Sequence, residues 1–314
     1  INLFFVYSEQ GGLANQFHIT VMAGGPGAER EISLRSGVAV QRALRSAGHC
    51  VMEVDPLDKG WKLSPDTEVV FLALHGEYGE DGQVQTRLEN LGVPYTGSGP
   101  EGSRVAFDKG LTKQVFDQNE IPTPRWTMLA NTAAPVPAHL GEGWVLKPPR
   151  QGSSVGLRIV EAPEKWSEAL AVAGDYGGPV LCEELIRGRE ITVGILDDAA
   201  LPIVEVRPKD GLYDYHNKYT VGATDYFCPA DLPADTADRI TEISLKSFTA
   251  VGASEFGRVD LMLDEALNPF VLEVNTLPGL TETSLLPKAA AVAGLDFAVL
   301  CGRMVGLAVK NHVG

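Results

Sequence analysis

Two apolar segments in the last fifth of the chain carry polar side chains at alternate positions. Residues 257–263 (GRVDLML) and 270–275 (FVLEVN) are rich in β-forming residues and are separated by a short polar break, which predicts two adjacent buried strands. Because side chains alternate along a strand, each segment places its polar residues on a single face. If the strands pair, that face gathers Arg258, Asp260, Glu273 and Asn275. Unpaired charges are costly to bury, so a cluster of charged residues on a buried strand face predicts a functional site.

The oxygen atoms in this cluster indicate the kind of ligand. Carboxylate and amide oxygens suit hard cations such as Mg²⁺, which keeps several waters and bridges to substrate phosphates. Asp260, Glu273 and Asn275 are therefore the candidate metal ligands. The first hypothesis is a metal–nucleotide site that performs chemistry.

The first hundred residues alternate strand and helix patterns. Predicted strands at 18–23, 50–54 and 69–74 and a helical pattern at 31–47 are typical of a parallel, doubly wound α/β sheet. Ligands of such sheets lie at the carboxyl ends of the strands. The segments Gly24-Gly25 and Leu74-His75-Gly76 fall there.

Size and charge narrow the function classes. A chain of 314 residues accommodates two or three domains. A net charge of −15 argues against a nucleic acid or an anionic membrane as the main partner. No apolar run approaches the roughly 20 residues that span a bilayer, and residues 1–7 are too short for a secretory signal. The four cysteines form no CxxC pair, so we expect reduced, mostly buried thiols and a cytoplasmic location.

A polar Gly/Ser loop follows a predicted strand at 144–148. Its backbone N–H groups and hydroxyls, with Lys147 beside them, suit an anion, although no Walker A sequence is present. Alone, such a loop is more often a solvent-exposed turn. Joined to the acidic cluster, it favours phosphate binding.

Several further residues leave alternatives open. Glu183 and Glu190 suit either an acidic edge or hydrogen bonds to an adenine amine and ribose hydroxyls. The aromatic segment 213–219 is equally consistent with a lid that excludes water and with a loop packed on its own domain. Taken alone, His75 is more often structural than catalytic. Helix capping explains one of the two glutamates Glu29 and Glu31 but not both.

Taken together, the motifs resemble the D-alanine–D-alanine ligases, a family of the ATP-grasp superfamily. The matching segments are GGPGAEREISL at 24–34, LHG at 74–76, YTGSG at 95–99, DK at 108–109, KP at 147–148, GSSVG at 152–156, YDYHNKY at 213–219 and EVNTLPG at 273–279. The resemblance implies that ATP phosphorylates the carboxylate of one D-alanine and that the amine of a second attacks the acyl phosphate.

The resemblance also implies residue roles. The metal, two Mg²⁺ ions or Mn²⁺, would be held by Asp260, Glu273 and Asn275, and ATP by Lys109, Lys147, Gly152, Ser154, Glu183 and Glu190. The catalytic set would be Glu29, Ser153, Tyr219, Arg258 and Gly279, with Arg258 facing the tetrahedral intermediate. The amino acids would also contact His75, Lys218, Ser284 and Leu285.

The expected architecture is three α/β domains of the ATP-grasp type. Residues 1–17 are left unassigned, and the domains are 18–103 for substrate, 104–186 for the central ATP-grasp unit, and 187–314 for the catalytic unit with a lid at 207–229. A homodimer is expected from the resemblance. The alternatives are a D-alanyl-D-lactate or D-alanyl-D-serine ligase of the same fold and a nucleotide-binding regulator without turnover.

Overall fold

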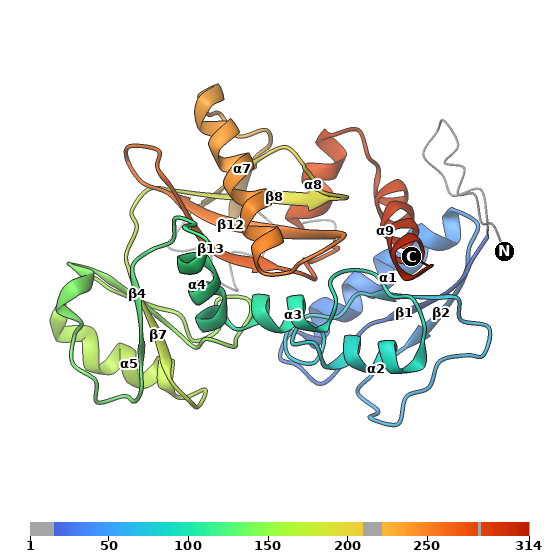
Figure 1. Cartoon of the computed structure of the whole chain (residues 1–314), viewed down its shortest axis with the longest axis horizontal. Helices are drawn as coiled ribbons and strands as arrows, with labels where there is room; N and C mark the ends of the chain where they lie inside the picture. Colours follow the sequence, from blue (N-terminus) through green and yellow to red (C-terminus); the bar gives the residue numbers. More distant parts are fainter. Residues whose placement is uncertain (1–15, 210–221, 282–283, 314) are drawn as a thin grey trace.

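The structure, a computed structural model, describes residues 16–209, 222–281 and 284–313. Its elements form three β-sheets that lie in separate parts of an elongated molecule (Figure 1). The sheets fall within the predicted segments 18–103, 104–186 and 187–314, whose exact boundaries stay a prediction.

The first sheet is parallel, as the β/α alternation predicts. Its strand order is β2-β1-β3, with β1 at His18–Met22, β2 at Cys50–Val54 and β3 at Val69–Leu72. Helix α1 (Arg30–Ser46) connects β1 to β2, and helices α2 (Gln83–Leu91) and α3 (Pro100–Phe107) follow β3. The segment after β1 and the segment after β3 therefore meet at the carboxyl ends of the strands, which places Glu29 near His75.

The second sheet is antiparallel, with the order β4-β7-β5-β6. Its strands are β4 (Trp126–Leu129), β5 (Trp144–Lys147), β6 (Arg158–Val160) and β7 (Val180–Glu184). A short 3-10 turn at Ala138–Leu140 lies before β5, another at Pro163–Lys165 precedes helix α5 (Trp166–Gly174), and α5 packs on the sheet. The segment 119–143 is rich in Pro and Ala, a composition that predicts loops, but it contains β4, a four-residue edge strand that pairs with β7.

The third sheet is antiparallel and holds the strand pair that carries the polar cluster. The order is β11-β10-β8-β12-β13, and a two-residue strand β9 (Ala199–Ala200) pairs with β8. The strands are β8 (Arg189–Leu196), β10 (Val204–Pro208), β11 (Thr224–Phe227), β12 (Phe256–Leu263) and β13 (Pro269–Asn275). Helix α7 (Ala234–Ala250) covers one face of this sheet (Figure 1). Helix α4 (Lys109–Gln118) packs beside it and contributes Phe116 to the same core.

The last two helices join the first sheet to the third. Helix α8 (Leu285–Val292) packs on β8, and α9 (Phe297–Val313) packs on α1 and β3. Met304 and Val305 of α9 are fully buried in one core with Ile19 of β1 and Phe71 of β3. In the described residues no single helix is long and apolar enough to cross a membrane, although α8 and α9, bent by 104° at their junction, meet that test as a pair.

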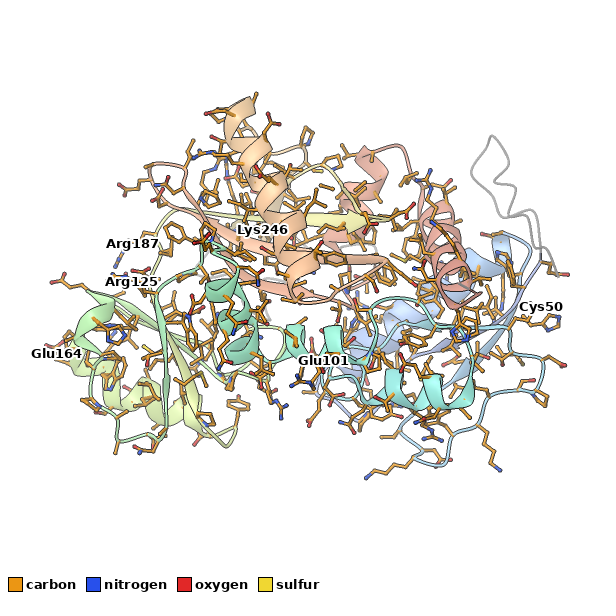
Figure 2. The ribbon with its side chains drawn as sticks, in the orientation of Figure 1. Cys50, Glu101, Arg125, Glu164, Arg187 and Lys246 are labelled. Carbon is orange, nitrogen blue, oxygen red and sulfur yellow. The ribbon has the colours of Figure 1, made fainter. Side chains whose placement is uncertain are left out.

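All four cysteines are free thiols, as expected. Cys182 and Cys301 are buried, Cys228 is half-buried, and Cys50 is exposed on the edge strand β2 (Figure 2). The expectation that most of them are buried therefore holds for two of the four positions.

Candidate functional site

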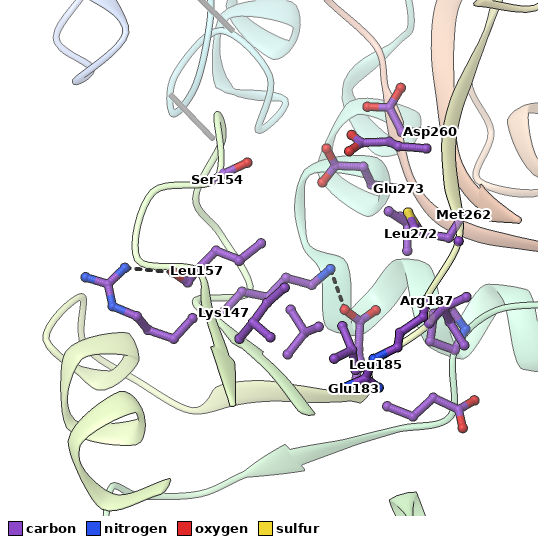
Figure 3. A pocket seen from close by; sticks show the side chains of 18 of the residues that line it. Lys147, Ser154, Leu157, Glu183, Leu185, Arg187, Asp260, Met262, Leu272 and Glu273 are labelled. Carbon is purple, nitrogen blue, oxygen red and sulfur yellow. Dashed lines mark hydrogen bonds and ion pairs between the residues drawn. The ribbon is translucent and has the colours of Figure 1, made fainter. Parts of the chain in front are cut away.

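A large cavity of about 1270 Å³ separates the second sheet from the third. It is lined by residues from β5, β7, β8, β10, β12 and β13, from the start of α4 and from the loop after Lys147. This volume is ample for a nucleotide. Asp260 and Glu273 form one end of the cavity, which we call the carboxylate end, and Glu183 lies at the other end (Figure 3).

The wall between these two ends is largely apolar. Met262 and Leu272 lie between the carboxylates and Leu185, and Leu185 lies next to Glu183 (Figure 3). An apolar slot with polar groups at its ends is the usual environment of a bound base. The lining therefore allows phosphates and a metal at the carboxylate end and a base at the Glu183 end, which we call the base end.

The carboxylate end has the strand register that the sequence predicts. In the β12–β13 pair, Asp260 lies opposite Glu273 and Arg258 lies opposite Asn275. Asp260 accepts two hydrogen bonds from Arg258, each 2.8 Å, together with one from the Asn275 amide at 3.0 Å. A fourth comes from the hydroxyl of Thr192 at 2.6 Å. The predicted convergence is confirmed, and Arg258 lies here as the charge partner of Asp260.

Glu273 has a different partner. Its carboxylate lies 3.1 Å from the Lys109 ammonium, which also donates to the carbonyl of Gln151 at 2.9 Å. Burial opposes the charge on Lys109, but Glu273 and the nearby Glu80 and Glu183 outweigh it, so the pKa of Lys109 is raised. This end of the cavity therefore holds a stable positive charge beside two carboxylates.

The donor set at this end fits Mg²⁺. Two carboxylates and an amide on facing strands match the protein share of an Mg²⁺ site, which is completed by water and substrate phosphates. Within the described residues no group of three or more His, Cys, Asp or Glu side chains is placed to hold a metal ion. A metal at this end would therefore depend on the Asn275 amide and on the phosphates of a nucleotide as well as on the two carboxylates.

At the base end, Glu183 is 1% exposed and has a lysine on each carboxylate oxygen. Lys113 lies 2.5 Å from one oxygen and Lys147 lies 2.5 Å from the other. Burial alone would raise the pKa of Glu183, but the two ammonium groups outweigh burial and lower it. Glu183 is therefore an anion held in place, and Glu190 lies in the adjacent wall of the same cavity.

The Gly/Ser loop bends from this cavity toward the first sheet. Ser153 and Ser154 both have positive φ angles, 50° and 59°, which is uncommon for residues with a side chain and is typical of functional loops. A Cβ atom at Gly152 would lie 2.4 Å from a carboxylate oxygen of Glu29, so a larger residue there would push the Glu29 side chain from its present position. The loop thereby brings the Ser153 hydroxyl to Glu29, to which it donates a hydrogen bond.

Glu29 lies at the start of α1 but does not cap it. It is 8% exposed and its side chain makes no capping hydrogen bond, whereas the exposed Glu31 lies in the first helical turn. The two glutamates therefore have separate environments, as the sequence suggests. Glu31 suits the positive end of the helix, and Glu29 points into a second cavity.

The second cavity is small, about 80 Å³, and adjoins the first. It is lined by predicted residues from all three parts of the chain: Glu29, His75, Gly152, Ser153, Arg258, Glu273, Asn275, Gly279, Ser284 and Leu285. Glu273 lines both cavities, so the carboxylate end of the large cavity is also the boundary with the small one.

His75 joins the first sheet to the loop after β13. Its Nδ1 lies 3.1 Å from the carbonyl of Leu277 and its Nε2 lies 3.0 Å from the hydroxyl of Ser36. The Ser36 oxygen in turn accepts the Leu280 N–H at 3.3 Å. Burial lowers the pKa of His75, so the neutral ring donates to Leu277 and accepts from Ser36. This network fixes the 277–280 loop, including Gly279, against the first domain.

Gly279 packs tightly against the start of α8. A Cβ atom there would lie 2.8 Å from the hydroxyl of Ser284. Ser284 precedes Leu285, the first residue of α8, and both line the small cavity. The free N–H groups at a helix start favour an anion such as a carboxylate.

Glu80 also lines the small cavity and was not identified from the sequence. One of its carboxylate oxygens accepts the N–H of Gly76 at 2.7 Å. Burial and the neighbouring charge of Glu29 raise the pKa of Glu80 to about 8. In the segment 76–82 three acidic side chains stand close together, so sequence alone offered no means to select this one.

Two other residues of the site, Lys113 and Ser36, were not predicted from the sequence, and two predicted residues are outside the part of the chain that the structure describes. Lys113 follows Lys109 by one helical turn, a spacing that places both on one face of α4 and could have identified it. Ser36 carries no comparable signal. Lys218 and Tyr219 lie outside the described residues, as does most of the predicted lid.

Known proteins resemble this chain in both sequence and fold. Family models described as "D-ala D-ala ligase C-terminus" and "D-ala D-ala ligase N-terminus" match residues 115–306 and 54–98. A D-alanine–D-alanine ligase of Methylacidiphilum infernorum is 45% identical over 92% of this chain and 94% of its own length. One of Bordetella avium is 43% identical over 90% and 92%. The crystal structure of the Bacillus anthracis D-alanine–D-alanine ligase complexed with ATP matches with a TM-score of 0.83 and 32% identity, covering 96% of this chain and 99% of that one.

Proposed function

This chain belongs to the D-alanine–D-alanine ligase family, and from this we propose that it joins two D-alanines into a dipeptide with hydrolysis of ATP to ADP and phosphate. The dipeptide serves as a peptidoglycan precursor. The observation that carries the proposal is the position of Glu273, which lines both a nucleotide-sized cavity and an adjoining small one. A phosphoryl group can pass from one to the other only at such a boundary.

ATP would lie in the large cavity with its base near Glu183 and Glu190. Its phosphates would lie toward Lys109, Lys147 and the loop that contains Gly152 and Ser154. Asp260, Glu273 and Asn275 would hold Mg²⁺, which when bound offsets negative charge on the transferring phosphoryl group. The open donor set and the lysine beside Glu273 support this orientation.

The first D-alanine would occupy the small cavity with its ammonium at Glu29, whose orientation Ser153 sets. Its carboxylate oxygen attacks the terminal phosphorus, and the bond between that phosphorus and the ADP oxygen breaks. The product is D-alanyl phosphate. The position of Glu273, which lines both cavities, supports this step.

The second D-alanine attacks the acyl carbon with its neutral amine, and phosphate leaves. Arg258 and the backbone N–H of Gly279 would stabilise the oxyanion of the tetrahedral intermediate. For this role Arg258 would exchange its present partner Asp260 for the intermediate, and both residues lie at the junction of the two cavities. Ser284, Leu285 and Lys218 would receive the second carboxylate, His75 would position the Gly279 loop, and Tyr219 would close the lid.

The reaction is tested by phosphate release with mass detection of the product. D-alanine alone should give D-alanyl-D-alanine and one phosphate per dipeptide. Turnover that requires D-lactate or D-serine as second substrate would instead favour a related ligase, and no phosphate release with any of them would favour a regulator. Asp260→Asn should lower turnover and raise the Mg²⁺ concentration needed for half-maximal activity; an unchanged Mg²⁺ dependence would contradict the metal assignment.

Two further features stay proposals that rest on family membership. We expect a homodimer, which sedimentation velocity of the purified chain would reveal. We also expect the enzyme to act in the cytoplasm, where ATP is available.

A further inference from the structure

A buried ion cluster lies at the base end of the large cavity. It consists of Lys113 on α4, Glu183 on β7 and Lys147 on β5, whose side chains are 0%, 2% and 8% exposed. Each carboxylate oxygen of Glu183 contacts a different ammonium group, both at 2.5 Å. The cluster thus holds one more positive than negative charge. Such an excess of positive charge favours the binding of an anion in the cavity.

The two lysines differ in their access to the cavity. Lys147 lines it together with Glu183, and its ammonium points along the cavity wall toward Glu183 (Figure 3). Lys113 does not line it. Its ammonium instead donates to the hydroxyl of Thr123, which donates at 2.7 Å to the carbonyl of Val271 on β13. Lys113 is therefore anchored from behind the cavity wall, whereas Lys147 is next to any bound ligand.

This difference matters when a phosphate arrives. A lysine that turns toward phosphates leaves the carboxylate it had neutralised, and a buried carboxylate without a counter-ion is strongly unfavourable. If Lys147 is the lysine that moves, Lys113 still neutralises Glu183 and the cluster becomes a one-to-one pair. The departing Lys147 also vacates one carboxylate oxygen at the base end of the cavity.

We propose that Lys113 is a positioning residue for the nucleotide: it stays paired with Glu183 while Lys147 exchanges Glu183 for the phosphates of ATP. Glu183 thereby remains charged, with one oxygen fixed by Lys113 and the other available to an amine on the base. This inference rests on the proposed function, which assigns Lys147 to the phosphates and Glu183 to the adenine amine.

The electrostatics of the cluster agree with this exchange. Burial lowers the pKa of Lys113 to about 8, while the charge of Glu183 opposes that lowering and the charge of Lys147 adds to it. Movement of Lys147 toward phosphate removes one of the influences that disfavour the Lys113 ammonium. The remaining pair is therefore more firmly charged with ATP bound than without it.

The test compares Lys113→Met with wild type using ATP and ITP, in which a carbonyl replaces the adenine amine. Met has similar length and no charge. We expect the KM for ATP to rise at least 10-fold, with the KM for D-alanine and kcat at saturating ATP within about 3-fold of wild type. The preference for ATP over ITP should fall as well, because Glu183 is no longer held for the amine. A general structural defect would raise both nucleotide KM values equally.

Further variants make the result decisive. In a Glu183→Gln background, Lys113→Met should add no further rise in the KM for ATP, because the carboxylate it serves is gone. If Lys113→Met fails to fold, Lys113→Gln replaces it, because it removes the charge but keeps a donor for Thr123, and it should give the same rise in the KM for ATP. Lys246→Met, exposed on α7 away from the cavity (Figure 2), is the matched control and should match wild type.

The outcomes separate this inference from its premise. Absence of phosphate release by wild type with D-alanine would overturn the proposed function. A wild type that uses ATP and ITP equally would overturn the assignment of Glu183 to the adenine amine. If wild type prefers ATP and Lys113→Met keeps both that preference and the wild-type KM for ATP, the role of Lys113 would be overturned. It would also be overturned if Lys113→Met raises the KM for ATP as much in the Glu183→Gln background as it does in wild type.

Discussion

The two adjoining cavities each contain a glutamate, and the pKa values of these two carboxyl groups are shifted in opposite directions. In the large cavity, Glu183 has two lysine partners and its pKa is lowered. In the small cavity, Glu80 has a backbone N–H and the nearby charge of Glu29, and its pKa is raised to about 8. Burial raises the pKa of both carboxyl groups, and only at Glu183, the more buried of the two, do neighbouring ammonium groups reverse that effect. The lysines therefore keep Glu183 charged, whereas the negative charge of Glu29 favours the protonated form of Glu80.

The largest expected effect lies in the lysine-paired cavity. Glu183→Gln leaves Lys113 and Lys147 without their carboxylate, and loss of one member of a buried ion cluster costs about 3–5 kcal/mol. We expect the free energy of unfolding in urea, measured without ligands, to fall by about that amount. The neighbouring Glu184 pairs with Arg125, whose side chain is 59% exposed, so Glu184→Gln should cost less than about 1 kcal/mol. Equal losses in the two variants would show that the lysines do not stabilise Glu183.

An intermediate effect is expected in the small cavity. Glu29→Gln keeps an acceptor for the Ser153 hydroxyl but loses the negative charge that the proposed function assigns to the substrate ammonium. A hydrogen bond to a charged group contributes about 1.5–3 kcal/mol, so kcat/KM for D-alanine should fall roughly 10- to 100-fold. The KM for ATP should change little. Steady-state rates with each substrate varied test this, with the exposed Glu31→Gln as control; an effect confined to the KM for ATP would place Glu29 with the nucleotide.

The last effect concerns pH and develops gradually. Because the pKa of Glu80 is raised above its unfolded value near 4.5, the unfolded chain releases this proton first as pH rises. Stability is therefore lost between about pH 4.5 and pH 8, and Glu80→Gln should remove that loss. Relative to wild type, the variant should gain about 3–5 kcal/mol between pH 4.5 and pH 9, because each unit of pKa shift corresponds to about 1.4 kcal/mol.

Urea unfolding of both proteins across this pH range measures the gain. The exposed Glu77→Gln lies in the same turn and should show a constant difference from wild type. A constant difference for Glu80→Gln as well would mean that its carboxyl titrates normally in the folded state.

Strand alternation was sufficient to predict the centre of the site. It places Arg258, Asp260, Glu273 and Asn275 on one face, and the β12–β13 register confirms this. Polar side chains at the edge of the first sheet were predicted for the same reason, since strand ends in a parallel sheet meet at one edge. These features depend on local periodicity, which sequence records directly.

Partners set by packing could not be predicted in the same way. Lys113 lies 70 positions before Glu183 in the sequence, and the two meet only because the fold brings α4 beside the end of β7. The present pairing of Arg258 with Asp260 likewise depends on side-chain rotamers. Strand β4 was missed because it is a short edge strand that is stabilised by pairing with β7 rather than by its own composition.

The position of α9 has a consequence for synthesis of the protein. Met304 and Val305 complete the core around β1 and β3, although nearly the whole chain separates them from β1. A ribosome releases the strands of the first sheet long before it releases α9, so this sheet cannot close its core as the nascent chain emerges. The first part of the chain to be made is therefore among the last to become stable, and its apolar face stays open for most of translation.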